Sequence, residues 1–190
     1  ATGYPREKMY GIWWGGSDHD VRDIGAGAKG YNTVTIHNTA ERDKIHDEVK
    51  ATLYDKSQGT AKDPKELGQL AHTRGMVIAM LQVESIRTAQ EKYGKGKTMT
   101  PEQVRWGLEN LNLTQERLNA LGFGKIIRPF KTSCDNHLGA DWQRIATWDG
   151  SKFVVSSDWY QADKGLIAPL VKEYADKYAK EKSVKTRTCN

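Results

Sequence analysis

The residue types best suited to binding chemistry lie in the stretch KMYGIWWGGSDHDVRDIGAGAKGY, residues 8–31. Trp13 and Trp14 offer flat apolar faces on which a ligand can stack. Gly15 and Gly16 follow them, and glycines let a backbone approach a ligand closely. The combination is typical of a small-molecule site. Tryptophans that pack in the core, followed by an ordinary glycine turn, would have the same sequence.

The residues around this motif indicate how it is positioned. The apolar run 9–14 predicts a buried strand, and Ser17-Asp18 is a helix-cap signal. The first turn of a helix offers unpaired N–H groups and the positive end of the helix dipole. In open α/β sheets, ligands bind where a strand ends and a helix begins. From the residues alone this turn is either a binding element or a packed turn.

Reactive chemistry is not favoured elsewhere in the chain. Residues 18–20 read Asp-His-Asp, but consecutive helical residues point in different directions and do not converge on one metal ion. Cys134 and His137 lie three residues apart in a loop without an orienting acid, so a nucleophile and base pair is not expected. The GAGAKG motif from Gly25 falls inside a predicted helix, not after a strand, and fails the context of a nucleotide-binding loop. We expect no enzyme activity, no metal and no cofactor.

Composition restricts the class of protein. The chain has 190 residues and a net charge of +5, with Lys and Arg mixed among acids, as in KEYADKYAKEKSVK (residues 172–185). A nucleic-acid-binding protein would gather its basic residues on one face, so nucleic acid is not an expected partner. No apolar run approaches the ~18 residues that a membrane-spanning helix needs. The chain opens without a leader or an initiator Met, which favours a piece of a longer protein.

Apolar spacing and capping signals predict an α/β fold, with strands and helices alternating early. The predicted strands cover residues 9–14, 31–37, 144–148 and 152–157. The predicted helices cover residues 18–30, 39–53, 64–94, 100–111, 115–121 and 164–182. Residues 76–81 are apolar on all sides, so we expect that helix to be buried. About four strands are few for a doubly wound sheet, which again favours part of a larger fold.

Several passages together resemble one family. Besides the opening stretch they are RGMVIAMLQVESIRTAQEKYG (74–94), EQVRWGLENLNL (102–113) and QRIATWDGSKFVVSSDW (143–159). In this order they resemble periplasmic substrate-binding proteins of ABC transporters, of the branched-chain amino acid (Leu/Ile/Val) type. The resemblance covers most of the chain and corresponds to the C-terminal half of such a protein.

The resemblance implies a two-lobed periplasmic-binding-protein type I architecture, in which two α/β lobes close on a ligand by hinge motion. Residues 1–37 would form part of the second lobe and residues 38–135 part of the first. Residues 136–190 would return to the second lobe and add the C-terminal helix. The remaining N-terminal half of the same protein is then an expected partner, and we do not expect this chain to fold as an autonomous domain.

Ligand contacts follow from the same resemblance. The implied second-lobe contacts are Trp13, Trp14, Gly15, Gly16 and Ser17. The implied first-lobe contacts are Ala71, His72 and Thr73. Family members that bind leucine-like amino acids place an acid where this chain has tryptophan, which favours an apolar or aromatic ligand over an α-amino acid. His72 is either a partner for a ligand carboxylate or a structural residue. Arg74 either pairs with an anionic ligand or anchors its helix to a neighbouring carbonyl, and we expect the anchor.

The two cysteines, Cys134 and Cys189, lie outside any CxxC motif, so a structural zinc site is not expected. From the residues alone they are either a disulfide or two unrelated thiols. The resemblance places both on the return into the second lobe, and the tail around Cys189 has little apolar surface to hold it down. We therefore predict that they pair.

The function implied by the resemblance is that of an extracytoplasmic receptor in the periplasm. It would deliver an amino-acid-like or small apolar or aromatic ligand to the membrane permease of an ABC transporter. The alternative is a ligand-sensing regulatory protein built on the same two lobes, because one fold serves several functions. A hydrolase would need a polar catalytic cluster that the sequence does not show.

Overall fold

The computed structural model describes residues 3–37, 42–61, 63, 66–139, 141–185 and 187–189, and only the backbone of Trp13 and Trp14. The α-helices are α1 (Asp18–Arg22), α2 (Lys44–Thr52), α3 (Leu70–Tyr93), α4 (Pro101–Leu108), α5 (Gln115–Ala120) and α6 (Lys164–Glu181). The 3₁₀ helices are η1 (Arg6–Lys8), η2 (Trp13–Gly16), η3 (Gly25–Ala28) and η4 (Tyr54–Lys56). The strands are β1 (Tyr10–Ile12), β2 (Asn32–Thr35), β3 (Asn112–Leu113), β4 (Phe130–Lys131), β5 (Trp142–Trp148), β6 (Phe153–Val155) and β7 (Tyr160–Gln161).

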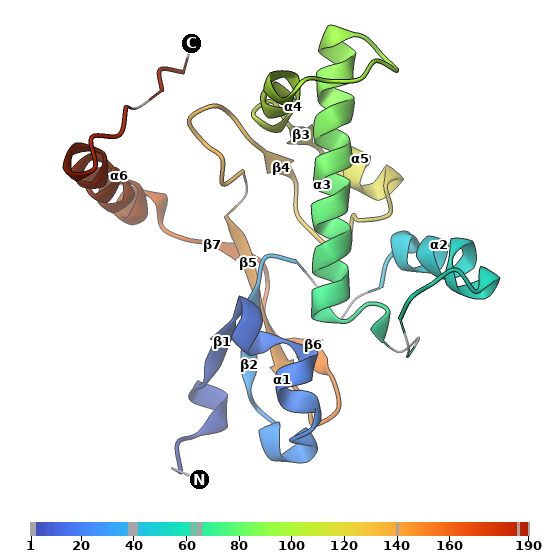
Figure 1. The fold of residues 1–190 in the computed structure, drawn as a ribbon. Coiled ribbons are helices and arrows are strands. Elements are labelled where there is room, and N and C mark those ends of the chain that lie inside the picture. Colours follow the sequence, from blue (N-terminus) through green and yellow to red (C-terminus); the bar gives the residue numbers. More distant parts are fainter. Residues whose placement is uncertain are drawn as a thin grey trace.

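The main sheet is mixed, as Figure 1 shows for the blue and orange strands. Strands β1 and β2 are parallel, and β5 lies antiparallel to β2, β6 and β7. The predicted hairpin between β5 and β6 is confirmed. The Asp149 carboxylate closes its turn by accepting the Lys152 N–H at 2.9 Å, and Gly150 takes a φ of +113°. The predicted α/β class therefore holds for the described chain.

A first apolar core lies beside this sheet. Trp148 of β5 is 2% exposed and packs edge-on against Phe153 of β6, with ring centroids 5.2 Å apart. Its indole N–H donates to the Gly25 carbonyl at 2.9 Å, so the polar edge of the ring is satisfied inside the core. Val21, Ala28 and Ala146 complete this core, which we call the sheet core.

A second core lies under α3, and we call it the helical core. Its buried members are Val77, Met80, Leu111, Leu113, Leu118, Phe123, Ile126 and Ile127. Helix α4 crosses α3 closely at Gly107, where an added Cβ would lie 2.0 Å from the Ser85 carbonyl oxygen. The predicted starts of α4 and α5 are confirmed, because the hydroxyls of Thr100 and Thr114 cap them. The two cores are separate clusters at the two ends of the connecting strands.

Two N-terminal elements are shorter than predicted. The strand expected over 9–14 ends at Ile12, because the chain turns into η2 at Trp13. The helix expected over 18–30 ends at Arg22, since Gly25 takes a left-handed φ of +58° that an α-helix does not contain. The chain continues as η3, so the GAGAKG segment is a separate 3₁₀ turn.

Helix α3 differs from prediction in its start and in its burial. It begins at Leu70, because Gly68 with a φ of +90° interrupts any helix running from residue 64. The expectation that 76–81 is buried on all sides is wrong for the described chain. Ile78 is 49% exposed, since α4 and α5 cover only one face of α3.

Helix α6 stands apart from both cores in Figure 1. Its predicted extent is confirmed, yet its apolar side chains are exposed along the whole helix: Leu166, Ile167, Leu170, Val171, Tyr174 and Tyr178. In the part of the chain that the structure describes, no helix has the length and apolar character needed to cross a bilayer.

Candidate functional site

The glycine turn after β1 is built against its own sheet. At Gly16, an added Cβ would lie 2.1 Å from the Thr33 hydroxyl oxygen on β2, so this glycine is required by packing. The Tyr31 hydroxyl donates to the Gly15 carbonyl and fixes the turn. Gly15 itself is exposed, and nothing lies within 4 Å of where its Cβ would be. Of the two glycines, only Gly15 leaves open space for another molecule.

The hydrogen-bonding groups of Ser17, at the start of α1, already have partners within the chain. The Ser17 N–H and hydroxyl both donate to one Asp20 carboxylate oxygen, at 3.0 and 2.9 Å. The helix has only five residues. The expectation that Ser17 offers free donors to a ligand is therefore not met in this arrangement, because its groups are used for capping.

The structure brings the two predicted contact segments together. The Asp18 carboxylate, on α1, accepts the Leu70 backbone N–H at 3.0 Å. Leu70 is the first residue of α3, so the carboxylate also lies at the positive end of the α3 dipole. This hydrogen bond joins segments 52 residues apart and places the glycine turn beside the start of α3.

The three predicted residues of α3 have different environments. Ala71 is exposed, and His72 is half-buried with Nδ1 accepting the Gly68 N–H at 3.4 Å. This contact leaves the proton of a neutral ring on Nε2, which can donate to a ligand oxygen. Burial lowers the pKa of His72, so the ring is neutral at pH 7. Thr73 is 0% exposed and contacts His46 at 3.4 Å, so it packs α3 and does not face a ligand.

A small cavity of about 60 Å³ opens where β1 and β2 end. Its lining residues are Ile12, Val34, Thr35, Ile36, Arg74 and Gln143. Arg74 is 9% exposed, and burial lowers the pKa of its guanidinium. A guanidinium in such a cavity is suited to a carboxylate. The sequence favoured a helix anchor for Arg74 over a partner for an anionic ligand, and no local signal pointed to Thr35 or Gln143.

His37, at the end of β2, is a buried histidine that the sequence reasoning did not single out. It is 1% exposed, and its pKa is lowered to about 4, first by burial and then by the charge of Arg74. Thr35 holds its backbone, because the Thr35 hydroxyl donates to the His37 carbonyl at 2.7 Å. His37 is therefore neutral at pH 7, and it lies in the segment that connects the two cores.

This arrangement is suited to binding. The guanidinium of Arg74 lines the cavity at the ends of two parallel strands, and the exposed Gly15 turn and the neutral imidazole of His72 lie in the two segments that the Asp18–Leu70 hydrogen bond joins. Among the described residues, no three His, Cys, Asp or Glu side chains come together in a way that could hold a metal ion. Cys134, considered above as a nucleophile, is bonded to Cys189, so the predicted pairing of the cysteines is present in the structure.

The chain was compared with known proteins. No protein-family model matches it, and no curated protein does. It superposes on the crystal structure of an ABC transporter permease from the Pseudomonas fluorescens group with a TM-score of 0.91 and 38% identity, over 99% of this chain and 45% of that one. It also superposes on a branched-chain amino acid ABC transporter from Thermus thermophilus with bound valine, with a TM-score of 0.60 and 21% identity, over 80% of this chain and 39% of that one.

The chain thus spans less than half the length of either matched structure. The Thermus thermophilus match, at 21% identity, establishes a shared fold alone. The mixed α/β chain is structurally similar to proteins of ABC transport systems.

Proposed function

We propose that this chain is the C-terminal portion of a two-lobed solute receptor that delivers a small ligand to the permease of an ABC transporter. The observation that carries the proposal is the hydrogen bond from Leu70 to Asp18. It joins the turn expected to touch ligand from one lobe to the helix start expected to touch it from the other. A cleft assembled from two such segments suits a receptor that closes on its ligand.

The residues around this cleft favour an apolar or aromatic ligand that carries a carboxylate. Arg74, which lines the cavity, is suited to an anionic group, and the Nε2 proton of His72 is a second donor at the start of α3. The acid beside them, Asp18, already accepts the Leu70 N–H, so it is not a free partner for a ligand ammonium. The tryptophan pair of the opening turn supports an apolar ligand body.

The lobe assignment is part of the proposal. Residues 1–37 and 136–190 hold the sheet core and would belong to the second lobe, and residues 38–135 hold the helical core of the first. Several large apolar side chains are exposed to water in this chain. Large exposed apolar patches mark interaction surfaces, which supports the packing of another segment against them. The exposed side chains include Tyr10 and Ile12 on β1, Ile78, Val83 and Ile86 on α3, and the apolar row of α6. We propose the N-terminal half of the same protein as the segment that covers them.

The disulfide discriminates between the receptor and a cytoplasmic ligand-sensing regulator on the same fold. Disulfides persist in oxidising compartments and are rare in the cytosol. The Cys134–Cys189 bond therefore favours a periplasmic location and the receptor role. We propose no enzyme activity and no cofactor.

Ligand titration of the intact protein tests the proposal. The panel contains branched-chain amino acids, aromatic amino acids and aromatic carboxylates without an amino group, each followed by tryptophan fluorescence. We expect saturable quenching by an aromatic carboxylate, and a loss of affinity of at least about tenfold in Arg74→Gln. Arg22→Gln, at an exposed arginine of α1, is the matched control and should bind as the wild type does. Absence of saturable binding by every class would contradict the receptor role.

A further inference from the structure

A second cavity lies far along the chain from the proposed ligand cleft, between α3, α4 and the loop after β4. Its volume is about 450 Å³. Its apolar walls are Leu81, Leu108, Leu111 and Phe130, and its polar residues are Arg105, Glu109, Thr132, His137 and Arg187. Arg187 comes from the C-terminal tail, 50 residues after His137, so the tail forms one wall of this cavity.

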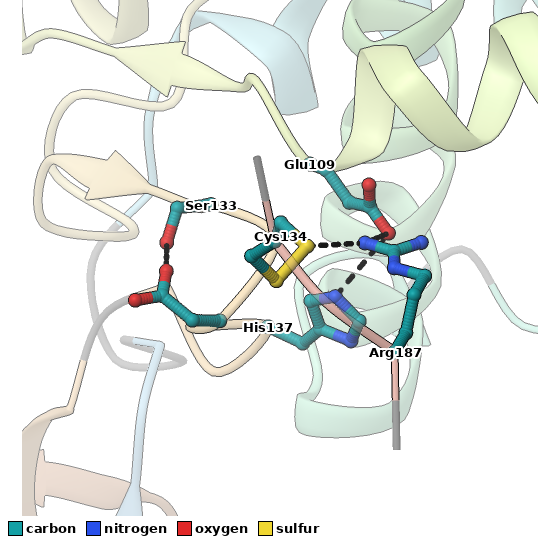
Figure 2. Close-up of a disulfide and its surroundings, with 7 residues drawn as sticks. Glu109, Ser133, Cys134, His137 and Arg187 are labelled. Atoms are coloured by element: carbon teal, nitrogen blue, oxygen red, sulfur yellow. Dashed lines mark hydrogen bonds and ion pairs between the residues drawn. A yellow bond between two sulfur atoms is a disulfide. The ribbon is translucent and has the colours of Figure 1, made fainter. Parts of the chain in front are cut away.

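The tail is held there by few contacts. Cys189 is bonded to Cys134, and the Arg187 guanidinium lies 2.7 Å from the Glu109 carboxylate. The same guanidinium donates to the Cys134 sulfur. Figure 2 shows the Arg187 guanidinium beside the disulfide, with Arg187 and His137 directed toward the same Glu109 oxygen. The Glu109 side chain is only 12% exposed, so Arg187 supplies charge compensation to a largely buried acid.

The two ends of this attachment differ in rigidity. Cys134 lies in a tight turn, in which the Ser133 and Asn136 backbones exchange N–H···O=C hydrogen bonds. By contrast, the helix that leads to Cys189 contributes no residue to either core of the described chain. Every residue of α6 is exposed there except the half-buried Ala179. The tail is therefore attached to the helical core by the disulfide and the Arg187–Glu109 ion pair, and the disulfide holds Arg187 close to Glu109 at high effective concentration.

We propose that residues 187–189 are a strap that closes the cavity under α4, and that the Cys134–Cys189 bond is its redox-sensitive latch. A dithiol reductant opens the latch. One of its thiolates attacks a sulfur of the bond, its second thiol resolves the mixed disulfide, and both cysteines leave as thiols while the reductant becomes a cyclic disulfide. Arg187 then leaves Glu109, and the apolar wall formed by the half-buried Leu81 and Phe130 becomes more accessible. This inference is independent of the proposed ligand cleft.

The test uses the intact protein and the apolar anion 8-anilinonaphthalene-1-sulfonate, whose fluorescence rises on apolar surface. We expect a dithiol to raise the bound fluorescence at least about threefold, with faster hydrogen exchange in residues 130–139. The double variant Cys134→Ser/Cys189→Ser should show this signal without reductant and no further response to it. Wild-type protein titrated with dithiol gives the same answer if that variant does not fold.

Two tail variants separate the strap from general loss of stability. Arg187→Gln, with the disulfide intact, should raise probe binding part of the way. Lys185→Gln, an equally basic tail position that does not line the cavity, should leave it unchanged. If reduction lowers the melting temperature but changes neither probe binding nor exchange in 130–139, the disulfide is a structural crosslink only and the proposal is wrong.

Discussion

Helices α3 and α6 are the two longest helices of the described chain, and both carry many apolar residues, but their surroundings are opposite. Helix α3, of 24 residues, buries Val77 and Met80 in the helical core. Helix α6, of 18 residues, exposes Val171 at 61% and Tyr174 at 68%. The comparison shows that apolar spacing specifies a helix and its apolar face. Which segment packs against that face is decided by the rest of the structure.

The ion pairs of the two helices also differ in burial. Glu84 of α3 is 2% exposed and is held by Arg117 at 2.6 Å and by Arg87 at 2.9 Å. Burial alone would raise the pKa of Glu84, but its hydrogen bonds to the two arginines outweigh burial and lower it. On α6, Lys172 and Asp176 form an exposed pair of the kind that contributes little. Helix α3 is thus fixed by both packing and charge.

Removing the buried carboxylate should have the largest effect. Glu84→Gln leaves two arginines without their shared anion and should lower the free energy of unfolding by about 3 kcal/mol. Glu91→Gln, two turns further along α3, breaks only an exposed pair with Arg87 and should cost less than about 0.5 kcal/mol. Urea denaturation of both variants measures the difference. Equal losses would mean that Glu84 is not specially important to α3.

The close crossing of α3 and α4 gives the next largest effect. Gly107→Ala places a methyl group against the Ser85 carbonyl and should destabilise by about 2.5 kcal/mol, because the helices must move apart. Gly75→Ala, in the same helix as Ser85 but with nothing within 4 Å, should stabilise by about 0.5 kcal/mol. A tolerated alanine at Gly107 in the same denaturation assay would contradict the crossing geometry.

Lowering the pH should reduce the free energy of unfolding, because His37 is buried in its neutral form. The pKa of His37 falls from 6.5 to about 4 on folding, so its contribution to stability is full above pH 6.5 and is lost as the pH falls toward 4. Between pH 7 and pH 5 this loss is about 2 kcal/mol. His46 and His72, whose pKa values are also lowered by burial, act in the same direction. The stability of His37→Gln should vary less steeply with pH; an unchanged slope would assign the effect elsewhere.

The most direct comparison of the two helices uses the same substitution in each. Val77→Ala, at a residue 6% exposed, should cost about 1.5 kcal/mol because it leaves a cavity in the helical core. Val171→Ala, at a residue 61% exposed, should cost less than about 0.5 kcal/mol in the 190-residue chain. A cost at Val171 that appears only in a longer form of the protein would show that another segment covers α6.

Local signals predicted some elements well because their causes lie within a few residues. The Thr100 capping box sets the start of α4, where the Gln103 side chain accepts the Thr100 N–H at 2.9 Å. The Asp149-Gly150 turn likewise sets the β5–β6 hairpin. The start of α3 at Leu70 was not predicted, because it depends on the backbone of Gly68 and on a carboxylate 52 residues away.

The site was only partly predictable for the same reason. Its turn was found from Gly15 and its neighbours, and the fold brings that turn to the predicted helix start. The effect of the Arg74 charge on His37 was missed, because the two lie 37 residues apart and their proximity arises only from tertiary packing. The burial of Thr73 was not predicted either, because nothing local distinguishes a buried threonine from an exposed one.

The central claim is that the turn from Trp13 to Ser17 and the start of α3 form a ligand cleft. Calorimetric titration of the intact protein tests it, using the panel member that quenches tryptophan fluorescence most strongly. Trp13→Ala or Trp14→Ala should weaken binding at least about tenfold, because stacking on the apolar ligand is lost. If both variants bind every member of the panel as tightly as the wild type, these tryptophans are packing residues and the cleft assignment is wrong.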